Sequence, residues 1–491
     1  MRADGMVGSL VTAAVVLLSQ AAEAKGTVIR AWRGETVTAS LQPGEKVSET
    51  GGLEVKVGVR RPVKYTLSPK WIDYSNAYDR VEWGGTGDGP RVVSVSVPEK
   101  TRPGKYRLGD VELEVVDRVL PPASEWKYWL DLWQHPWAVA RYFDVEPFSK
   151  EHYAKMEPLW RRLAAAGQKT LTTSILDLPW NHQCYDGYYT MIRHRKGKDG
   201  KWTFDYAVFD EYVAFGKRCG IGPYVSCYSM CPWNNVAYYE DDKGNPHASG
   251  TARPGTPFFD EYWRAFLVDF AAHLREKGWF ETTYIAMDER SPEDVRLIAD
   301  FIQKHAPGMK ISMAGNRKPS DFKGIAIDNY SQALQFVNRD FLSEVDERRD
   351  DGKVTTFYVC CGPGRSNTFL LSRPAEAFWN GFYPAACGLD GFLRWAYNSW
   401  PANPIVCGNY GGWAAGDTYL IYPDGSPSIR FLELERGIVA AEKFRILKEQ
   451  GKRKAELDAL AKRFDPGRAM SRDGEDFERL EADTLAAVNA Q

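Results

Sequence analysis

The sequence predicts an α/β fold in which a (β/α)8 barrel of the TIM type follows an all-β sandwich domain. The first reason is that residues 25–120 alternate apolar and polar side chains between glycine and proline turns, a pattern typical of antiparallel strands. The second is that residues 125–446 alternate eight short apolar runs with helical stretches, the order of a (β/α)8 barrel. The third is the length of 491 residues, which indicates more than one domain.

Residues 1–24 have the features of a signal peptide. Arg2 gives a positive start, residues 7–18 are apolar but short for a membrane span, and residues 22–24 (Ala-Glu-Ala) fit the small-x-small cleavage rule. We therefore expect a mature chain that begins at Lys25, in a secreted or periplasmic protein. No later segment is apolar for long enough to cross a bilayer, so no membrane span is expected after cleavage.

Short strands separated by turn residues are predicted within residues 25–120. Apolar and polar residues alternate over segments such as 36–39, 53–57, 91–97 and 111–115. Dipeptides such as Pro43-Gly44 mark the turns between them. The alternation gives each strand one apolar face, as expected of a small antiparallel β-sandwich, and two consecutive prolines then form a linker to the next domain.

Eight strand-like runs follow this linker, and helical stretches lie between most of them. The predicted strands are 126–133, 169–176, 222–228, 283–288, 310–314, 325–330, 355–360 and 391–397. The clearest predicted helices are 150–166, 258–277, 292–305 and 338–349. The fifth connection, 315–323, is too short for a full helix, and the longest loops follow the second and third strands. Residues 447–491 are polar and favour helix without a clear apolar face, which predicts a packed or partly mobile helical tail.

The overall composition narrows the kinds of partner. A formal net charge of −2 argues against nucleic acid or an anionic membrane. The 17 Trp, 25 Tyr and 23 Phe suit the apolar C–H faces of sugars, although most of the Trp are expected to fill the core. Seven scattered His and eight Cys form no good zinc signature, so no metal site is expected, while the even number of Cys allows a disulfide or two.

The acid pair Asp288-Glu289 is the most informative feature of the sequence. A predicted strand covers residues 283–288, and Ser291 opens the next helix, so the two acids fall at the end of the fourth barrel strand, where such barrels bind ligands. Adjacent strand residues point to opposite faces, so the strand must bend at its end if both acids share one pocket. The other Asp-Glu pairs, interpreted as solvated helix residues, are at 210–211, 260–261 and 346–347.

Two carboxyl groups at a strand end are suited to glycoside hydrolysis, which needs an acid for the leaving oxygen and a group that stabilises positive charge on the sugar. The tip of the predicted seventh strand, residues 360–364, carries no acid, so a protein nucleophile is missing there. In the alternative route, a 2-acetamido group of the substrate attacks its own anomeric carbon and forms an oxazolinium ion. An ionised Asp288 should then raise the pKa of Glu289 and keep it protonated near neutral pH.

Six motifs carry a resemblance to a known family. They are LDLWQHPW (130–137), CYSMCPW (227–233), KGWFETTYIAMDER (277–290), GFLRWAYNSW (391–400), GDTYLIYPDG (416–425) and SIRFLELERG (428–437). With these motifs, most of residues 125–450 resembles glycoside hydrolase family 123, the β-N-acetylgalactosaminidases. The resemblance implies a β-sandwich ahead of a (β/α)8 barrel, and exo-acting release of terminal β-linked N-acetylgalactosamine from glycans or glycolipids by substrate-assisted retention, without a cofactor. It implies Asp288 as the acetamido-orienting stabiliser and Glu289 as the general acid/base.

Aromatic residues near the predicted strand ends are the candidate substrate-binding residues. Tyr330, at the tip of the predicted sixth strand, is suited to bind the acetamido oxygen, and Trp395, at the end of the eighth, to stack on the sugar. The remaining candidates are Tyr397, Trp400, Trp133, His135, Trp180 and Trp233. Packing in the core or wall is an equally good interpretation of each residue, and His135 also fits a hydrogen-bonded structural histidine.

Two other functions are consistent with the same residues. The first is a β-N-acetylglucosaminidase of the same mechanism, because the sequence does not distinguish one axial hydroxyl. The second is a non-catalytic glycan-binding surface protein on a decayed hydrolase scaffold, and the intact Asp288 and Glu289 argue against it.

Overall fold

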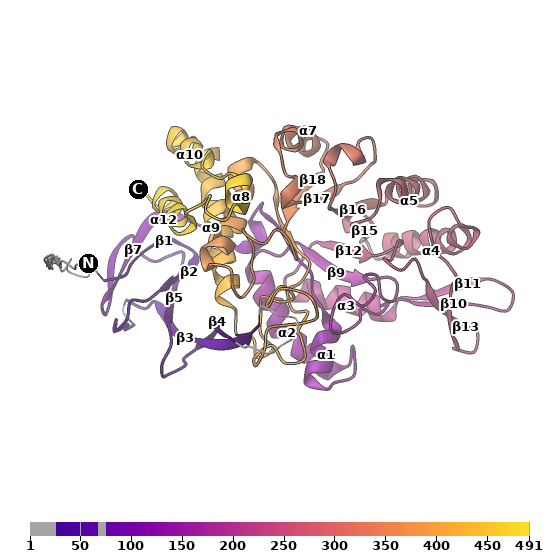
Figure 1. Cartoon of the computed structure of the whole chain (residues 1–491), viewed down its shortest axis with the longest axis horizontal. Coiled ribbons are helices and arrows are strands. Elements are labelled where there is room, and N and C mark those ends of the chain that lie inside the picture. The colour runs from indigo at the N-terminus through magenta and orange to yellow at the C-terminus, as the bar shows by residue number, and fades with distance from the viewer. Residues whose placement is uncertain (1–25, 50, 67–74, 491) are drawn as a thin grey trace, which may run out of the picture.

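The structure is a computed structural model that describes residues 26–49, 51–66 and 75–490. The predicted signal peptide, residues 1–24, lies outside the described residues. In Figure 1 the N-terminal β-rich domain (indigo) lies at one end of the molecule, and the C-terminal helices (yellow) lie beside it. The barrel fills the middle and the other end, so the predicted class, a (β/α)8 barrel preceded by a β-rich domain, is confirmed.

Two sheets with a shared core make up the N-terminal domain. One sheet has the strand order β1 (Val28–Arg33), β7 (Val111–Val119), β6 (Gly104–Leu108). The other has the order β2 (Glu35–Ser40), β5 (Arg91–Val97), β3 (Glu54–Tyr65), β4 (Ser75–Trp83). Aliphatic residues of both sheets form the core between them, among them Ile29, Val95 and Leu113. The prediction of a purely antiparallel sandwich is wrong in one respect, because β1 pairs with β7 in parallel.

Eight parallel strands stand in chain order around the barrel. They are β8 (Trp129–Leu132), β9 (Thr170–Ser174), β12 (Tyr224–Tyr228), β15 (Thr283–Asp288), β16 (Lys310–Gly315), β17 (Asn329–Ala333), β18 (Val354–Tyr358) and β19 (Gly391–Arg394). The sheet returns from β19 to β8, and the amide of Lys169 donates to the carbonyl oxygen of Leu130 (3.0 Å), which nearly closes the barrel between β8 and β9. Nearly every strand residue is buried, as expected where helices cover a parallel sheet.

Helices follow the strands on the outside of the barrel. They are α1 (Pro136–Phe143), α2 (Lys150–Ala165), α3 (Ala207–Arg218), α4 (Pro257–Glu276), α5 (Pro292–His305), α6 (Arg339–Ser343), α7 (Val345–Asp350), α8 (Pro374–Cys387) and α9 (Ile429–Glu449). Serine side chains cap α2, α5 and α9 by accepting a backbone amide hydrogen bond, which stabilises the first turn. The fifth connection contains only a 3-10 turn (Pro319–Phe322), as its length predicts, and the predicted helix 338–349 is split into α6 and α7.

The long loops after the second and third barrel strands form a small sheet of their own. Its spatial order is β11 (Trp202–Asp205), β10 (Arg193–Lys196), β13 (Tyr238–Asp241) and β14 (Pro246–Ala248). This sheet lies at the end of the molecule opposite the N-terminal domain (Figure 1). The prediction that the longest loops follow these two strands agrees with this arrangement.

The C-terminal segment is packed, and the prediction that it lacks an apolar face is wrong. Its helices are α10 (Lys454–Ala461), α11 (Pro466–Met470) and α12 (Phe477–Val488). Apolar side chains recur at helical spacing and are buried where α10 and α12 contact α8 and α9; they include Leu457, Leu460, Phe464, Phe477 and Leu480. These stripes are narrow and lie among many charged residues, so the average polarity of the segment concealed them.

Buried polar contacts join the N-terminal domain to the C-terminal half of the chain. Asp79 in β4 accepts hydrogen bonds from Nε and Nη2 of Arg430 in α9, both at 2.9 Å, and from the hydroxyl of Tyr422 at 2.6 Å. The indole N–H of Trp32 in β1 donates to the carbonyl oxygen of Val488 in α12 (3.1 Å). Because these groups are almost completely buried, the N-terminal domain is fixed against the barrel.

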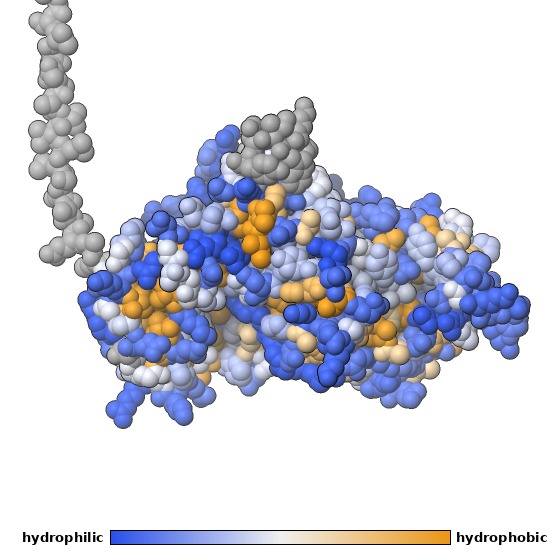
Figure 2. Space-filling model, turned by 90° about the horizontal axis from the view of Figure 1, so that it is seen from below, coloured by the Kyte–Doolittle hydropathy of each residue, from blue (hydrophilic) through white to orange (hydrophobic). Residues whose placement is uncertain are grey.

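The surface carries small hydrophobic patches, and one large cavity lies outside the barrel. On the face drawn in Figure 2, hydrophobic side chains lie in separate patches among hydrophilic ones. A cavity of about 1100 Å³ lies between the N-terminal domain, the linker and the C-terminal helices, and residues such as Glu35, Trp83 and Glu481 line it. Among the described residues, no helix is both long and apolar enough to cross a membrane.

Candidate active site

The acid pair lies at the C-terminal end of β15, as the sequence predicts. Asp288 is the last residue of the strand, and Glu289 follows in a left-handed backbone conformation with a φ of 52°. The amide of Glu289 donates to the carbonyl oxygen of Ala314 in β16 (2.9 Å), which anchors this turn. The positive φ redirects the chain, and both acids therefore line one pocket, as the predicted bend requires.

The ends of several barrel strands, and the loops that follow them, form this pocket. The described residues that line it are Trp133, Gln183, Trp233, Asp288, Glu289, Ala314, Tyr358, Cys360, Cys361, Leu393, Trp395 and Trp413. Asp288 and Glu289 are the only carboxyl groups in that lining. Three of the predicted binding residues belong to it, namely Trp133, Trp233 and Trp395. The pocket therefore combines one acid pair with walls that are rich in indole rings.

Tyr358 is a pocket residue that the sequence analysis missed. It is the last residue of β18, and its hydroxyl donates a hydrogen bond to Oε1 of Glu289 (2.7 Å). Burial raises the pKa of Tyr358 well above its ordinary value, and the nearby charges of Glu289 and Asp288 raise it further. The hydroxyl consequently stays protonated and holds the carboxyl group of Glu289. Its position at the end of a barrel strand was the signal that could have identified it.

Asp288 has the more constrained carboxyl group of the pair. Burial raises the pKa of Asp288 well above its ordinary value, and repulsion from Glu289 adds to the rise. A hydrogen bond from the side chain of Trp180 and the positive charge of Arg290 act in the opposite direction. Burial is therefore the main cause of the raised pKa of Asp288, and the charge of its neighbour is the second. Two adjacent carboxyl groups in such a site resist double ionisation.

Aromatic rings pack below and beside the acid pair. The rings of Trp133 and Trp180 stack with centroids 5.0 Å apart, and each lies 4.7 Å from the ring of Tyr228. The indole N–H of Trp233 donates to the backbone oxygen of Asp288 (3.1 Å). Trp180 is buried behind the pocket and reaches Asp288 through its hydrogen bond, so this predicted residue lies beside the acid pair without being part of the lining.

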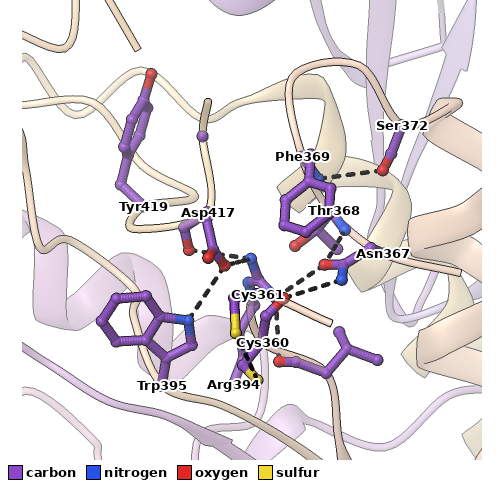
Figure 3. A network of polar contacts seen from close by, with 12 residues as sticks. Cys360, Cys361, Asn367, Thr368, Phe369, Ser372, Arg394, Trp395, Asp417 and Tyr419 are labelled. Atoms are coloured by element: carbon purple, nitrogen blue, oxygen red, sulfur yellow. Dashed lines mark hydrogen bonds and ion pairs between the residues drawn. The ribbon is translucent and has the colours of Figure 1, made fainter. Parts of the chain in front are cut away.

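Trp395 is held in the pocket wall by a buried polar network, which Figure 3 shows. Its indole N–H donates to Oδ1 of Asp417 (3.1 Å), and the same oxygen accepts from Nη2 of Arg394 (2.7 Å). Arg394 also donates to Oδ1 of Asn367 (3.1 Å). Because Arg394 and Asp417 are completely buried, the orientation of the Trp395 ring is fixed. Its neighbour Trp413, which the sequence analysis missed, lies in the glycine-rich loop after β19, 5.8 Å from it between ring centroids.

Tyr330 does not lie in the pocket, and the prediction that placed it at a strand tip is wrong. It is the second residue of β17, which starts four residues later than the predicted strand, at 329 instead of 325. Its ring packs against Phe322 (5.8 Å) and Phe341 (6.0 Å) on the outside of the barrel. Its hydroxyl donates to Oε1 of Gln332 (2.9 Å). Tyr358, one strand further along, is the tyrosine that faces the acids.

Tyr397, Trp400 and His135 are predicted binding residues whose contacts are structural. The hydroxyl of Tyr397 donates to the carbonyl oxygen of Leu159 (3.1 Å), and the indole of Trp400 donates to that of Ile421 (2.7 Å). Both side chains are completely buried outside the pocket lining, because the chain turns away from the barrel after Trp395.

His135 is the N-cap of α1 and is completely buried. Its Nδ1 accepts from the amide of Ala138 (3.3 Å), and its Nε2 donates to the carbonyl oxygen of Asp186 (3.2 Å). Burial lowers the pKa of His135 to about 3, so the ring is neutral. These contacts fit the interpretation of His135 as a hydrogen-bonded structural histidine and not as a substrate-binding residue.

The remaining acid pairs lie on helices, and the described residues contain no disulfide. The Asp-Glu pairs at 210–211, 260–261 and 346–347 lie on α3, α4 and α7, and all six residues are exposed except Asp210, which is half-buried. Within the part of the chain that the structure describes, no group of three or more His, Cys, Asp or Glu side chains is arranged to hold a metal ion. The eight cysteines are all unpaired thiols.

A (β/α)8 barrel with two carboxyl groups and tryptophan walls at the C-terminal ends of its strands is an arrangement typical of barrel glycosidases. The glycoside hydrolase 123 catalytic-domain model matches residues 133–447, more than half of the chain. The chain therefore belongs to glycoside hydrolase family 123, as its motifs predict, and is a glycosidase.

One solved structure agrees with this fold along nearly the whole chain. A family 123 glycoside hydrolase from Clostridium perfringens, described in an analysis of glycolipid glycan hydrolysis, superposes with a TM-score of 0.82 at 23% identity. The match covers 94% of this chain and 93% of that one. A Thermobacillus composti family 10 xylanase matches 63% of this chain and 97% of its own, at 10% identity, with a TM-score of 0.34. A search of curated protein sequences gave no match.

Proposed function

We propose that this glycosidase is exo-acting and releases terminal β-linked N-acetylgalactosamine from glycans or glycolipids by a retaining, substrate-assisted mechanism. The observation that carries the proposal is that Asp288 and Glu289 are the only carboxyl groups among the described residues that line the pocket, and that they are consecutive. Retaining enzymes with a protein nucleophile need a second carboxyl group across the substrate. Here the seventh strand contributes Tyr358, Cys360 and Cys361 to the pocket instead.

In this mechanism the acetamido oxygen of the substrate attacks the anomeric carbon while Glu289 protonates the leaving oxygen. The reaction needs Glu289 protonated and Asp288 ionised, so that Asp288 accepts the acetamido N–H as positive charge develops. In the free protein, burial and the neighbouring Glu289 raise the pKa of Asp288, whereas the hydrogen bond from Trp180 and the charge of Arg290 favour its ionised form. The proposal therefore requires the proton of the acid pair to lie on Glu289 once the acetamido N–H binds Asp288. A correctly oriented internal nucleophile can lower the activation free energy of hydrolysis by roughly 7–11 kcal/mol, because the attack becomes intramolecular.

Tyr358 replaces Tyr330 as the proposed donor to the acetamido oxygen. Its protonated hydroxyl lies 2.7 Å from Glu289 in the free protein, so a modest rotation would direct it to a substrate group bound between the acids. Trp395, Trp133, Trp233 and Trp413 supply ring faces for the sugar. The fixed orientation of Trp395 makes it the strongest candidate for stacking on the sugar.

The experiment that tests the proposal compares three aryl glycosides with purified protein. We expect release of 4-nitrophenol from the N-acetyl-β-D-galactosaminide and not from the plain β-galactoside, because only the former carries the internal nucleophile. Preferential cleavage of the glucosamine epimer would change the sugar while keeping the mechanism. Cleavage of the plain galactoside would overturn the mechanism, and glycan binding without any turnover would indicate a binding protein.

The predicted signal peptide extends the proposal to location. We propose that the protein acts outside the cytoplasm, either secreted or in the periplasm. Cell fractionation, with the N-terminal residue of the mature protein determined by sequencing, tests this. A mature chain that starts at Lys25 is expected, and a chain that retains residues 1–24 would contradict the proposal.

A further inference from the structure

Two neighbouring thiols lie in the wall of the candidate active site. Cys360 and Cys361 follow β18 directly after Tyr358 and Val359, and both line the pocket with Glu289. Their sulfur atoms are 3.8 Å apart, and Figure 3 shows them side by side next to Arg394 and Trp395. The mechanism proposed above uses neither thiol.

The surroundings of the two thiols make one of them reactive. Cys361 is exposed, and a hydrogen bond from Cys360 lowers the pKa of the Cys361 thiol. The same interaction, together with burial, raises the pKa of Cys360 far above its ordinary value. The first thiol of the pair to lose its proton is therefore Cys361, the more exposed of the two residues, and a thiolate is the form of cysteine that attacks disulfides.

The turn that carries the thiols is fixed by the network in Figure 3. The carbonyl oxygen of Cys360 accepts a hydrogen bond from Nδ2 of Asn367 (2.9 Å), and Asn367 is held in turn by Arg394. The amide of Cys360 donates to the carbonyl oxygen of Gly362 (3.0 Å). Because these hydrogen bonds hold the backbone of Cys360, both thiols stay next to each other at the pocket. Four of the other six cysteines are buried, and none of the six lines the pocket.

We propose that Cys360 and Cys361 are a modification site for small-molecule disulfides, at which thiol–disulfide exchange forms a Cys360–Cys361 disulfide and slows hydrolysis. The substrate used to measure hydrolysis rests on the proposed function, but the modification does not. In the first step, the Cys361 thiolate attacks one sulfur of the external disulfide and releases the other half as a thiolate. In the second step, Cys360 loses its proton and attacks Cys361 Sγ, which releases the second half.

Electrons and protons balance in this exchange. The two cysteines lose two electrons and two protons, and the external disulfide gains them and becomes two thiols. Ring closure ties together Cys360 and Cys361, which lie two and three residues after Tyr358, the residue that holds Glu289. We therefore expect the oxidised form to hydrolyse its substrate on the order of ten- to a hundredfold more slowly, since a displacement of a catalytic group by about 1 Å can cost up to about a hundredfold.

The experiment treats the full-length protein with oxidised glutathione and reads mass and activity in parallel. Trypsin should release residues 354–365, between Lys353 and Arg365, and Cys360 and Cys361 are the only cysteines in this peptide. We expect the peptide to lose the mass of two hydrogens, activity to fall, and dithiothreitol to restore both. Cys360→Ser should instead retain a stable glutathione adduct on Cys361, because the resolving thiol is absent.

Cys387→Ser is the matched control, since Cys387 is another incompletely buried thiol but lies in α8 outside the pocket. It should form the Cys360–Cys361 disulfide as the unmodified sequence does. Two results would overturn the proposal: free thiols in the 354–365 peptide after treatment, or a lasting glutathione adduct on it without ring closure. Ring closure with unchanged hydrolysis would overturn the effect on activity. The peptide mass is readable even if no aryl glycoside is cleaved, so failure of the proposed function would be recognised separately.

Discussion

Asp79 and Asp288 are both carboxyl groups that the fold encloses, and their neighbours differ. Asp79, between the N-terminal domain and the barrel, receives two hydrogen bonds from Arg430 and one from Tyr422. Asp288 has another carboxyl group, Glu289, beside it in the pocket lining. The first arrangement satisfies a buried charge and stabilises the fold. In the second arrangement two carboxyl groups repel each other when both are ionised, so one of them tends to keep a proton, which is then available for chemistry.

The largest effect should come from Glu289→Gln, which removes the proposed general acid. We expect hydrolysis of natural glycosides to fall by about 10²–10⁴-fold. Substrates with very good leaving groups should be affected less, because they need little protonation. Steady-state kinetics on a series of aryl leaving groups checks this. Glu211→Gln, at an exposed acid of another Asp-Glu pair, is the control and should leave the rates unchanged.

Arg430→Met tests the structural side of the comparison. The change leaves Asp79 buried without its cation, which we expect to destabilise the protein by about 3–5 kcal/mol. Thermal unfolding measures the loss. Arg161→Ala, which breaks an exposed pair with Glu157, should change little. An equally small loss for Arg430→Met would show that the buried pair does not stabilise the domain contact.

Asp288→Asn should lower hydrolysis of good and poor leaving groups alike, by about 10²–10³-fold, because every substrate needs its acetamido group oriented. The measurement is the same leaving-group series as for Glu289→Gln. If both variants responded to the leaving group in the same way, the assignment of separate roles to the two acids would be wrong.

Tyr358→Phe should have a smaller effect, about tenfold on kcat, because the change removes one hydrogen bond to Glu289 and the proposed donor to the acetamido group. The pH profile should move as well, since the hydroxyl that contacts Glu289 is lost. Tyr330→Phe is the matched control, because Tyr330 lies outside the pocket. A larger loss for Tyr330→Phe than for Tyr358→Phe would contradict the placement of these residues.

The smallest predicted effect has the opposite sign from that of Arg430→Met. The pKa of Asp288 is higher in the folded protein than its ordinary value of 3.8, so the folded state binds more protons. This contribution to stability is present at low pH and is lost as pH rises through the folded-state pKa. Asp288→Asn should therefore stabilise the protein at neutral and alkaline pH, by about 1 kcal/mol, and less at acidic pH. Unfolding midpoints measured across pH check the sign.

Much of the fold could be predicted because it depends on local patterns. The strand 283–288 and the helix 292–305 were placed at the bounds that the structure gives, since an apolar run and a capping serine mark them. The start of β17 could not be placed, because pairing with β16 determines it and hydrophobicity does not. Tyr330 was consequently assigned to the wrong end of its strand.

The acid pair was predictable, whereas most of its neighbours were not. A strand end shows where a carboxyl group emerges, but the residues opposite it come from other strands and from long loops. Tyr358 and Trp413 reach the pocket through the closure of the barrel and the path of the loop after β19. In the C-terminal segment the signal was present: Leu457, Leu460 and Phe464 recur at helical spacing, and their stripe was overlooked among the charges.

The contacts between the two ends of the chain also set a constraint on how the protein reaches this structure. Trp32 is bonded to a residue 456 positions away, and Asp79 to one 351 positions away. The ribosome synthesises the N-terminal domain first and the C-terminal helices last. Trp32 and Asp79 therefore have no hydrogen-bond partners during most of synthesis. Closing such distant contacts is slow. The early domain therefore completes its packing only when almost the whole polypeptide has been produced.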